Sequence, residues 1–172
     1  MSIDVGTGSG RSRSPCAREA HLQVTASDIS EQAVAVARKN AADNAADVTF
    51  LTGDMLEPFI EAGIRCDILV SNPPYIPVHE QMEHSVVDFE PHVALFGGED
   101  GLKFYREIFA NAHRVIKEKA ILAFEMGYDQ GERAGAGKGA FPGCTRGDHQ
   151  RSQRKESHAV CLSQPVKNDV FT

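Results

Sequence analysis

The feature that most constrains this chain is an apolar stretch that runs directly into two prolines. Residues 66–70 read as a short buried strand, and Asn72, Pro73, Pro74 and Tyr75 follow after one serine. Proline fixes φ and carries no N–H, so the strand cannot continue through the two prolines. The backbone must leave the sheet in a stiff turn. Asn72 is therefore expected at the carboxyl end of a strand, where open α/β sheets bind their ligands.

The chemistry of this turn suits a planar group that carries an NH2. The Asn72 side chain offers one carbonyl acceptor and two N–H donors, and Tyr75 offers a flat face and a hydroxyl. A plain alternative is that Asn72 caps a turn and the prolines only end the strand. The buried strand directly before the four residues favours a binding site instead.

A glycine-rich loop follows the first predicted strand, residues 2–5. It consists of Gly6, Thr7, Gly8, Ser9 and Gly10. Such a loop lets the backbone approach a ligand closely, with its N–H groups directed at the ligand. The pattern alone is weak evidence, because many loops contain it. Its weight comes from the acids that follow the next two strands.

Two acids lie at the ends of the next predicted strands, residues 22–28 and 48–51. Asp28 is placed to bind ribose hydroxyls. It is also a possible N-cap for a helix over residues 31–42, but Ser30 is the better cap and would leave Asp28 free for a ligand. Asp54 could accept from an adenine amino group while Met55 packs on the ring, although a surface turn explains Asp54 equally well.

Strands and helices alternate along the chain, which predicts a doubly wound, mostly parallel, Rossmann-like α/β sheet. Residues 58–65 are expected to be a connector, residues 101–117 an amphipathic helix and residues 120–125 a fifth strand. Residues 1–131 carry 11 Lys and Arg against 20 Asp and Glu, whereas residues 132–172 carry 7 against 4. The second segment also lacks strand-length alternation, so we expect an incomplete sheet and an aberrant or poorly ordered tail over 132–172.

Composition excludes several classes of protein. The net charge of −6 disfavours a protein that grips nucleic acid through a broad basic face. No apolar run approaches the roughly 20 residues that span a bilayer, and no signal peptide is evident. The scattered cysteines and histidines fit no metal-ligand spacing. We therefore expect a cytoplasmic, monomeric protein with reduced thiols and neither a metal nor a membrane partner.

The motifs together resemble the class I S-adenosylmethionine-dependent methyltransferases. Residues 4–10 are similar to the motif that binds the methyl donor, and Asp28 and Asp54 match the acids that bind its ribose and adenine. The sequence Asn-Pro-Pro-Tyr at 72–75 resembles the motif of enzymes that methylate planar nitrogens. In that resemblance, the Asn72 side chain and the Pro73 carbonyl accept hydrogen bonds from the target NH2, and Asn72 also borders the donor.

A longer series of segments narrows the resemblance to the release-factor glutamine methyltransferases of the HemK/PrmC family. Besides residues 70–77, it comprises residues 89–91, 95–102 and 124–127, in this order. The resemblance implies methyl transfer from S-adenosylmethionine to the side-chain amide nitrogen of a glutamine in a class I peptide-chain release factor. Asn72, Pro73, Pro74 and Tyr75 would bind and orient the amide, and Glu90 would order the substrate loop.

The chain departs from this family in three places. The family carries a small N-terminal helical domain, which we expect to be missing here, so that residues 1–131 form the catalytic domain alone. Residues 11–16, with Pro15, interrupt the helix expected after the glycine loop. Residues 132–172 lose the family pattern. We interpret both odd segments as products of reading-frame shifts, which translation of the other two frames would test; a divergent or disordered tail is the alternative.

Two rival functions remain open at this stage. One is an amino-methylating DNA or RNA methyltransferase, such as an N6-adenine enzyme, which would need cationic surface to hold the strand. The acidity of residues 1–131 argues against it. The other is a truncated, inactive methyltransferase fragment, which the three departures favour.

Overall fold

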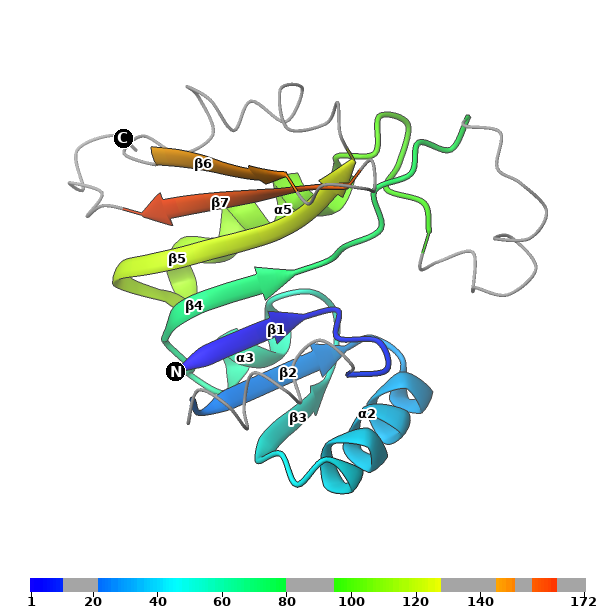
Figure 1. Ribbon diagram of the computed structural model, residues 1–172, viewed down its shortest axis with the longest axis vertical. Helices are drawn as coiled ribbons and strands as arrows, with labels where there is room; N and C mark the ends of the chain where they lie inside the picture. Colours follow the sequence, from blue (N-terminus) through cyan, green and yellow to red (C-terminus); the bar gives the residue numbers. More distant parts are fainter. Residues whose placement is uncertain (11–21, 80–94, 128–144, 151–155, 164–172) are drawn as a thin grey trace.

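A computed structural model gives the fold of the chain. It describes residues 1–10, 22–79 and 95–127, together with the backbone of residues 145–150 and 156–163. The strands form one sheet in the order β3-β2-β1-β4-β5-β7-β6 (Figure 1). The strands are β1 (Ser2–Val5), β2 (Val24–Asp28), β3 (Val48–Thr52), β4 (Cys66–Ser71), β5 (Ile116–Gly127), β6 (Thr145–Gln150) and β7 (Glu156–Ser163).

Strands β1 to β5 are parallel to one another, as the alternating pattern of the sequence predicts. The helices between them are α2 (Glu31–Asp43), α3 (Glu57–Glu61) and α5 (Lys103–Asn111), and a short 3-10 helix, η2, covers Ala112–Arg114. The strand order reverses between β1 and β4, which makes these two strands the switch point of the sheet. Ligands of open α/β sheets bind at that point.

The expectation of an incomplete sheet is wrong for the strands that the structure describes. β7 pairs antiparallel with β5, and β6 pairs antiparallel with β7. The expectation relied on side-chain alternation, but strand pairing is made by the backbone. β5 would otherwise present a row of unpaired N–H and C=O groups, and β7 satisfies them.

Two hydrophobic clusters hold the helices against opposite faces of the sheet. The larger one joins Ile3 and Leu69 of the sheet to Phe59 of α3 and to Tyr105 and Ile108 of α5, and all five are fully or almost fully buried. The smaller cluster packs α2 onto β2 and β3 through Ala26, Val34, Ala37, Ala41 and Phe50. Ala26 pairs with Asp4, whose neighbours Ile3 and Val5 point to the other face. The sheet is therefore doubly wound.

Three local predictions differ from the structure. The expected connector at 58–65 contains α3, whose first turn holds Pro58, a position that needs no N–H donor. The helix expected to reach residue 117 ends at Asn111 and continues only as η2. β5 begins at Ile116, before the apolar run that suggested it, because Ile116 pairs with Cys66 across a register shift.

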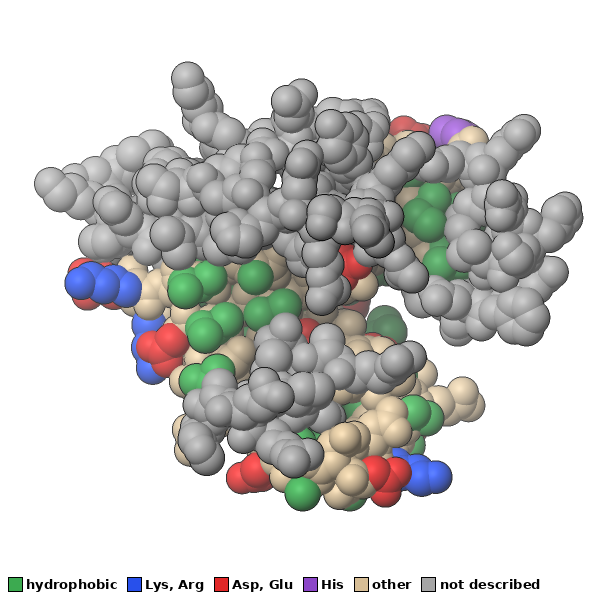
Figure 2. Space-filling view, viewed as in Figure 1, with side chains coloured by type: hydrophobic (Ala, Val, Ile, Leu, Met, Phe, Trp, Pro, Cys, Tyr) green, Lys and Arg blue, Asp and Glu red, His purple; other side chains and the backbone are tan. Residues whose placement is uncertain are grey.

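The face of β4 and β5 opposite α3 and α5 carries Ile68, Val70, Ile121 and Ala123, by strand alternation. Ile121 is 39% exposed, and Figure 2 shows hydrophobic side chains over these strands. Helices in the described part of the chain are all too short or too polar to cross a membrane.

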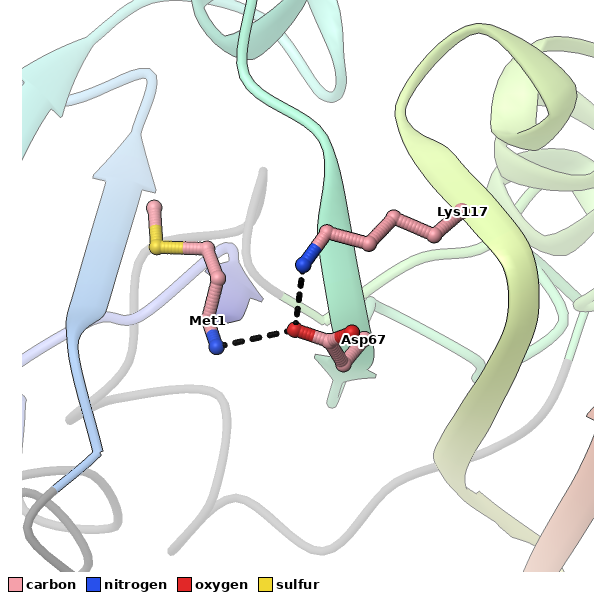
Figure 3. Close-up of polar contacts among 3 residues, drawn as sticks. All are labelled: Met1, Asp67 and Lys117. Atoms are coloured by element: carbon pink, nitrogen blue, oxygen red, sulfur yellow. Dashed lines mark hydrogen bonds and ion pairs between the residues drawn. The ribbon is translucent and has the colours of Figure 1, made fainter.

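An ion-pair cluster lies at the amino end of the central strands, away from the carboxyl edge. Asp67 Oδ2 accepts from the Met1 ammonium at 3.0 Å and from Lys117 Nζ at 2.8 Å (Figure 3). These hydrogen bonds hold the pKa of Asp67 below its usual value, and the bond from Lys117 has the larger effect. The cluster joins β1, β4 and β5 at the edge opposite the candidate site.

Candidate active site at the carboxyl edge of the sheet

The sheet register brings the predicted site residues into one row. Four residues on neighbouring strands pair in one row across the sheet: Ser27 of β2, Val5 of β1, Ser71 of β4 and Phe124 of β5. The next residues along these strands are Asp28, Gly6, Asn72 and Glu125. Neighbouring strands lie roughly 4.8 Å apart, so Gly6 and Asn72 emerge beside each other.

The glycine loop turns away from β1 with open space beside it. Gly6 and Gly8 have φ values of 71° and 56°, and a Cβ built on either would meet no atom within 4 Å. Gly10 is different, because a Cβ there would stand 3.0 Å from the Cβ of Ala37 in α2. The loop is thus packed tightly on α2 at its far end and open to a ligand at its near end.

Side chains fix both ends of this loop. Thr7 Oγ1 donates to the buried carboxylate of Asp4 at 2.7 Å, and Asn40 Nδ2 of α2 donates to the Ser9 carbonyl at 2.8 Å. The Thr7 N–H donates to the carbonyl of Ser27 in β2 at 2.9 Å. The loop is therefore preorganised rather than dependent on a ligand for its shape.

Asp28 is half-buried and already holds two backbone groups. Its Oδ2 accepts from the Gly8 N–H at 2.8 Å and its Oδ1 from the Ser30 N–H at 2.9 Å. Ser30 Oγ accepts from the Ala33 N–H, so Ser30 is the helix cap, as the sequence predicts. Asp28 is not left free, contrary to expectation. Each carboxylate oxygen has a second lone pair, so the side chain can still accept from a ligand hydroxyl.

Asp54 lies beyond the end of β3, in a turn joined to Asp28 through the Gly53 N–H, which donates to the Asp28 carbonyl at 3.1 Å. The Asp54 side chain is exposed. Met55 is half-buried against the large hydrophobic cluster. Packing of Met55 on an adenine ring stays a prediction.

Ile29 is a candidate site residue that was not predicted from the sequence. It follows Asp28 directly, and its side chain is 66% exposed. A large apolar side chain left in water beside the acid predicted to bind ribose offers a surface for the flat face of a ring. Its position one residue after a strand-terminal acid is the signal that could have found it.

The Asn72 turn lies on the neighbouring strand end. Ser71 is buried and donates from Oγ to the Val5 carbonyl at 2.8 Å, which ties β4 to β1 directly before both loops. The Asn72 side chain is exposed and makes no hydrogen bond with the other described residues. Pro73 is buried, and Tyr75 is half-buried against the large cluster. An unused amide on a rigid turn is suited to bind a ligand.

A second tyrosine, Tyr105, lies near Tyr75 of this turn and near Glu125. Tyr105 Oη donates to the Glu125 carbonyl at 2.6 Å. Burial raises the pKa of Tyr105 far above its ordinary value, and nearby Tyr75 and Glu125 add to the rise. Tyr105 therefore stays protonated and acts as a donor that fixes the end of β5. Glu125 was predicted to lie in a strand and was not among the predicted site residues.

Glu90, the remaining predicted site residue, lies outside the described residues, as do residues 11–16. Within the described ranges, no group of three His, Cys, Asp or Glu side chains could hold a metal ion. What the structure brings together is a glycine loop, an acid, and an amide turn on adjacent strand ends.

Residues 1–89 match the family model described as the methyltransferase small domain. The chain belongs to this family. Two curated relatives are both named release factor glutamine methyltransferase. The one from Bacillus anthracis is 46% identical over 143 residues, which cover 81% of the chain and 50% of the relative. The one from Bacillus subtilis (strain 168) is 48% identical over 132 residues, covering 75% and 46%.

The chain thus spans about half the length of the curated relatives it matches, and the resemblance to the HemK/PrmC family is confirmed. Among solved structures, a methyltransferase from Pyrococcus furiosus matches with a TM-score of 0.69 at 17% identity, covering 96% of the chain and 75% of that protein. At that identity the likeness concerns the fold alone, and it confirms the Rossmann-like methyltransferase sheet.

Proposed function

We propose that this chain transfers a methyl group from S-adenosylmethionine to the side-chain amide nitrogen of a glutamine in a class I peptide-chain release factor. The observation that carries the proposal is the exposed amide of Asn72 beside the open glycine loop, on paired strand ends. The names of the curated relatives support the substrate. Residues 1–131 would form the catalytic domain, working as a monomer in the cytoplasm, and residues 132–172 an aberrant segment.

The residues at the carboxyl edge fit the methyl donor. The open space beside Gly6 and Gly8 leaves room for a ligand against the backbone. Asp28 would hold the ribose, and Asp54 would accept from the adenine amino group, with Ile29 against the ring. When bound, the donor supplies a methyl group on a positively charged sulfur, which is a good leaving group.

The protein's contribution is positioning and electrostatics. An amide nitrogen is a poor nucleophile because its lone pair is delocalised into the carbonyl. The Asn72 side-chain oxygen and the Pro73 carbonyl would accept from the two N–H groups of the target, orienting the nitrogen and favouring positive character on it. Tyr75 would pack against the amide plane. No strong base is needed, because the methylated nitrogen is acidic enough to release its proton to water.

The charge of the domain disfavours a nucleic-acid substrate. Residues 1–131 carry 11 basic and 20 acidic side chains, so phosphates would be repelled. No observation in the described residues favours a base over an amide.

A labelled-methyl transfer assay tests the proposal. The full chain is incubated with labelled S-adenosylmethionine and either a release factor or duplex DNA, alongside Asn72→Ala and Asn72→Asp. We expect label on the release factor only, lost on the order of 100-fold or more in Asn72→Ala. Asn72→Asp keeps the acceptor oxygen and should retain part of the activity. Label on DNA, or equal rates in Asn72→Ala and the parent chain, would contradict the proposal; an absence of donor binding by calorimetry would indicate an inactive fragment.

A further inference from the structure

We propose that residues 95–98 form a backbone clamp that positions the Asn72–Tyr75 turn for methyl transfer, and that Gly97 is its positioning residue. The catalytic part of this inference rests on the proposed function. The structural part, that Gly97 holds the turn in place, does not.

The clamp is a short parallel pairing that continues the turn after its two prolines. Ile76 and Phe96 form an isolated parallel bridge. The Ile76 N–H donates to the Leu95 carbonyl at 3.1 Å, and the Gly97 N–H donates to the Ile76 carbonyl at 2.8 Å. The Val78 N–H donates to the Gly98 carbonyl at 3.0 Å. The prolines prevent β4 from continuing, so these bonds hold the chain where the sheet no longer can.

Gly97 brings the clamp closer than any other residue allows. A Cβ at this position would lie 2.5 Å from the Pro74 carbonyl oxygen and 2.8 Å from that of Gly101. Both neighbours are backbone atoms, so they cannot move aside as a side chain would. A substitution must therefore displace the Asn72–Tyr75 turn or the start of α5.

The clamp is itself fixed to the core through α5. The Lys103 N–H donates to the Gly97 carbonyl at 3.0 Å, so the first turn of α5 begins on the clamp. Two residues later, Tyr105 is 1% exposed and donates to the Glu125 carbonyl. Three hydrogen bonds and the first turn of α5 therefore link the end of β5 to Gly97 and to Ile76 beside the turn.

A shift of this turn would matter because the proposed acceptors belong to rigid backbone and a short side chain. A misplacement of about 1 Å can reduce a reaction rate on the order of 100-fold without abolishing binding. The methyl donor would be held by the loops on β1, β2 and β3, whereas the hydrogen bonds of the clamp join residues 76–78 to residues 95–98. Loss of the clamp should thus reduce the turnover rate and leave donor affinity unchanged.

The test compares Gly97→Ala with Gly63→Ala in the full chain. Gly63 has a φ of 64° and open space around a built Cβ, so its substitution strains the backbone before the amino end of β4, whereas the turn follows the carboxyl end of that strand. Three quantities are measured for each variant: amide hydrogen exchange at Ile76 and Val78, the dissociation constant for S-adenosylmethionine, and kcat on a release factor. Exchange is measured without the donor.

For Gly97→Ala we expect exchange at Ile76 and Val78 to accelerate about tenfold or more, kcat to fall about tenfold or more, and donor affinity to stay within about twofold. Gly63→Ala should change none of the three by that much. Equal exchange in the two variants would overturn the clamp. Fast exchange with unchanged kcat would overturn its catalytic role. If the parent chain transfers no methyl group, the proposed function fails while the exchange comparison still decides the clamp.

A second variant covers the possibility that Gly97→Ala does not fold. Val78 is exposed, and Val78→Pro removes the N–H that donates to Gly98. The same pattern is expected, with faster exchange at Ile76 and a lower kcat at unchanged donor affinity. Exchange and kcat equal to those of the parent chain would overturn the proposal.

Discussion

The Gly8 N–H donates to Asp28 Oδ2 across 2.8 Å, which ties the glycine loop after β1 to the acid that ends β2. One carboxylate therefore shapes the loop and also presents lone pairs to a ligand. Because each carboxylate oxygen has a second lone pair, an acid already bonded to the protein can still accept a hydrogen bond from a ligand.

Asp28→Ala should weaken S-adenosylmethionine binding by at least about tenfold. The change removes a charged acceptor and leaves the N–H groups of Gly8 and Ser30 without it, and hydrogen bonds to charged groups contribute about 1.5–3 kcal/mol. Titration calorimetry measures the dissociation constant. Asp47→Ala, which removes an exposed acid before β3, serves as the control. Equal dissociation constants for the two variants would show that Asp28 does not hold the donor.

Gly6→Ala should fold yet lose the donor. Its added Cβ would meet no protein atom within 4 Å, but would occupy the space beside the loop. Gly63→Ala is matched in backbone conformation, so both should lose about 1–2 kcal/mol of unfolding free energy. Only Gly6→Ala should lose donor affinity. Retained affinity in Gly6→Ala would place the donor elsewhere.

Tyr105→Phe should lower the free energy of unfolding by about 1–3 kcal/mol, because the Glu125 carbonyl loses its buried donor. Urea denaturation followed by circular dichroism measures this change. The ring itself remains packed edge-on against Phe124, so the core volume is nearly unchanged. An unaltered urea midpoint would mean that water replaces the hydroxyl without cost.

Asp100 should contribute to acid sensitivity. Hydrogen bonds from Arg106 and from the Leu102 N–H lower the pKa of its carboxyl to about 2. A depressed folded-state pKa stabilises the protein above the ordinary pKa of 3.8, and this contribution is lost as the pH falls from there towards 2. Urea titrations between pH 6 and pH 2 should show Asp100→Asn converging on the parent chain at the acid end. A constant difference across this range would contradict the ion-pair origin.

Much of the sheet could be predicted because its signals are local. Gly6, Asp28 and Asn72 each lie at the end of a strand that the sequence predicts, and parallel strands bring their carboxyl ends to one edge. The Ser30 cap was likewise visible as a serine before a helical pattern. Neither inference needs knowledge of distant contacts.

The rest depended on tertiary contacts that no local pattern encodes. The Gly8 bond to Asp28 joins residues 20 apart, and the clamp joins the turn to a segment about as distant. β7 pairs with β5 through the backbone, although its sequence lacks the expected alternation. The amphipathic pattern of residues 101–117 predicts a helix with an apolar face, but the bond from Tyr105 to Glu125 could not be inferred from spacing.

The most direct measurement is residue-level mass spectrometry of a release factor incubated with S-adenosylmethionine and the full chain. We predict a mass increase of one methyl group on a single glutamine side chain, absent with Asn72→Ala. An unmodified release factor would contradict the assignment, provided that calorimetry shows the donor bound. Modification of a residue other than glutamine, or modification that persists with Asn72→Ala, would contradict it as well.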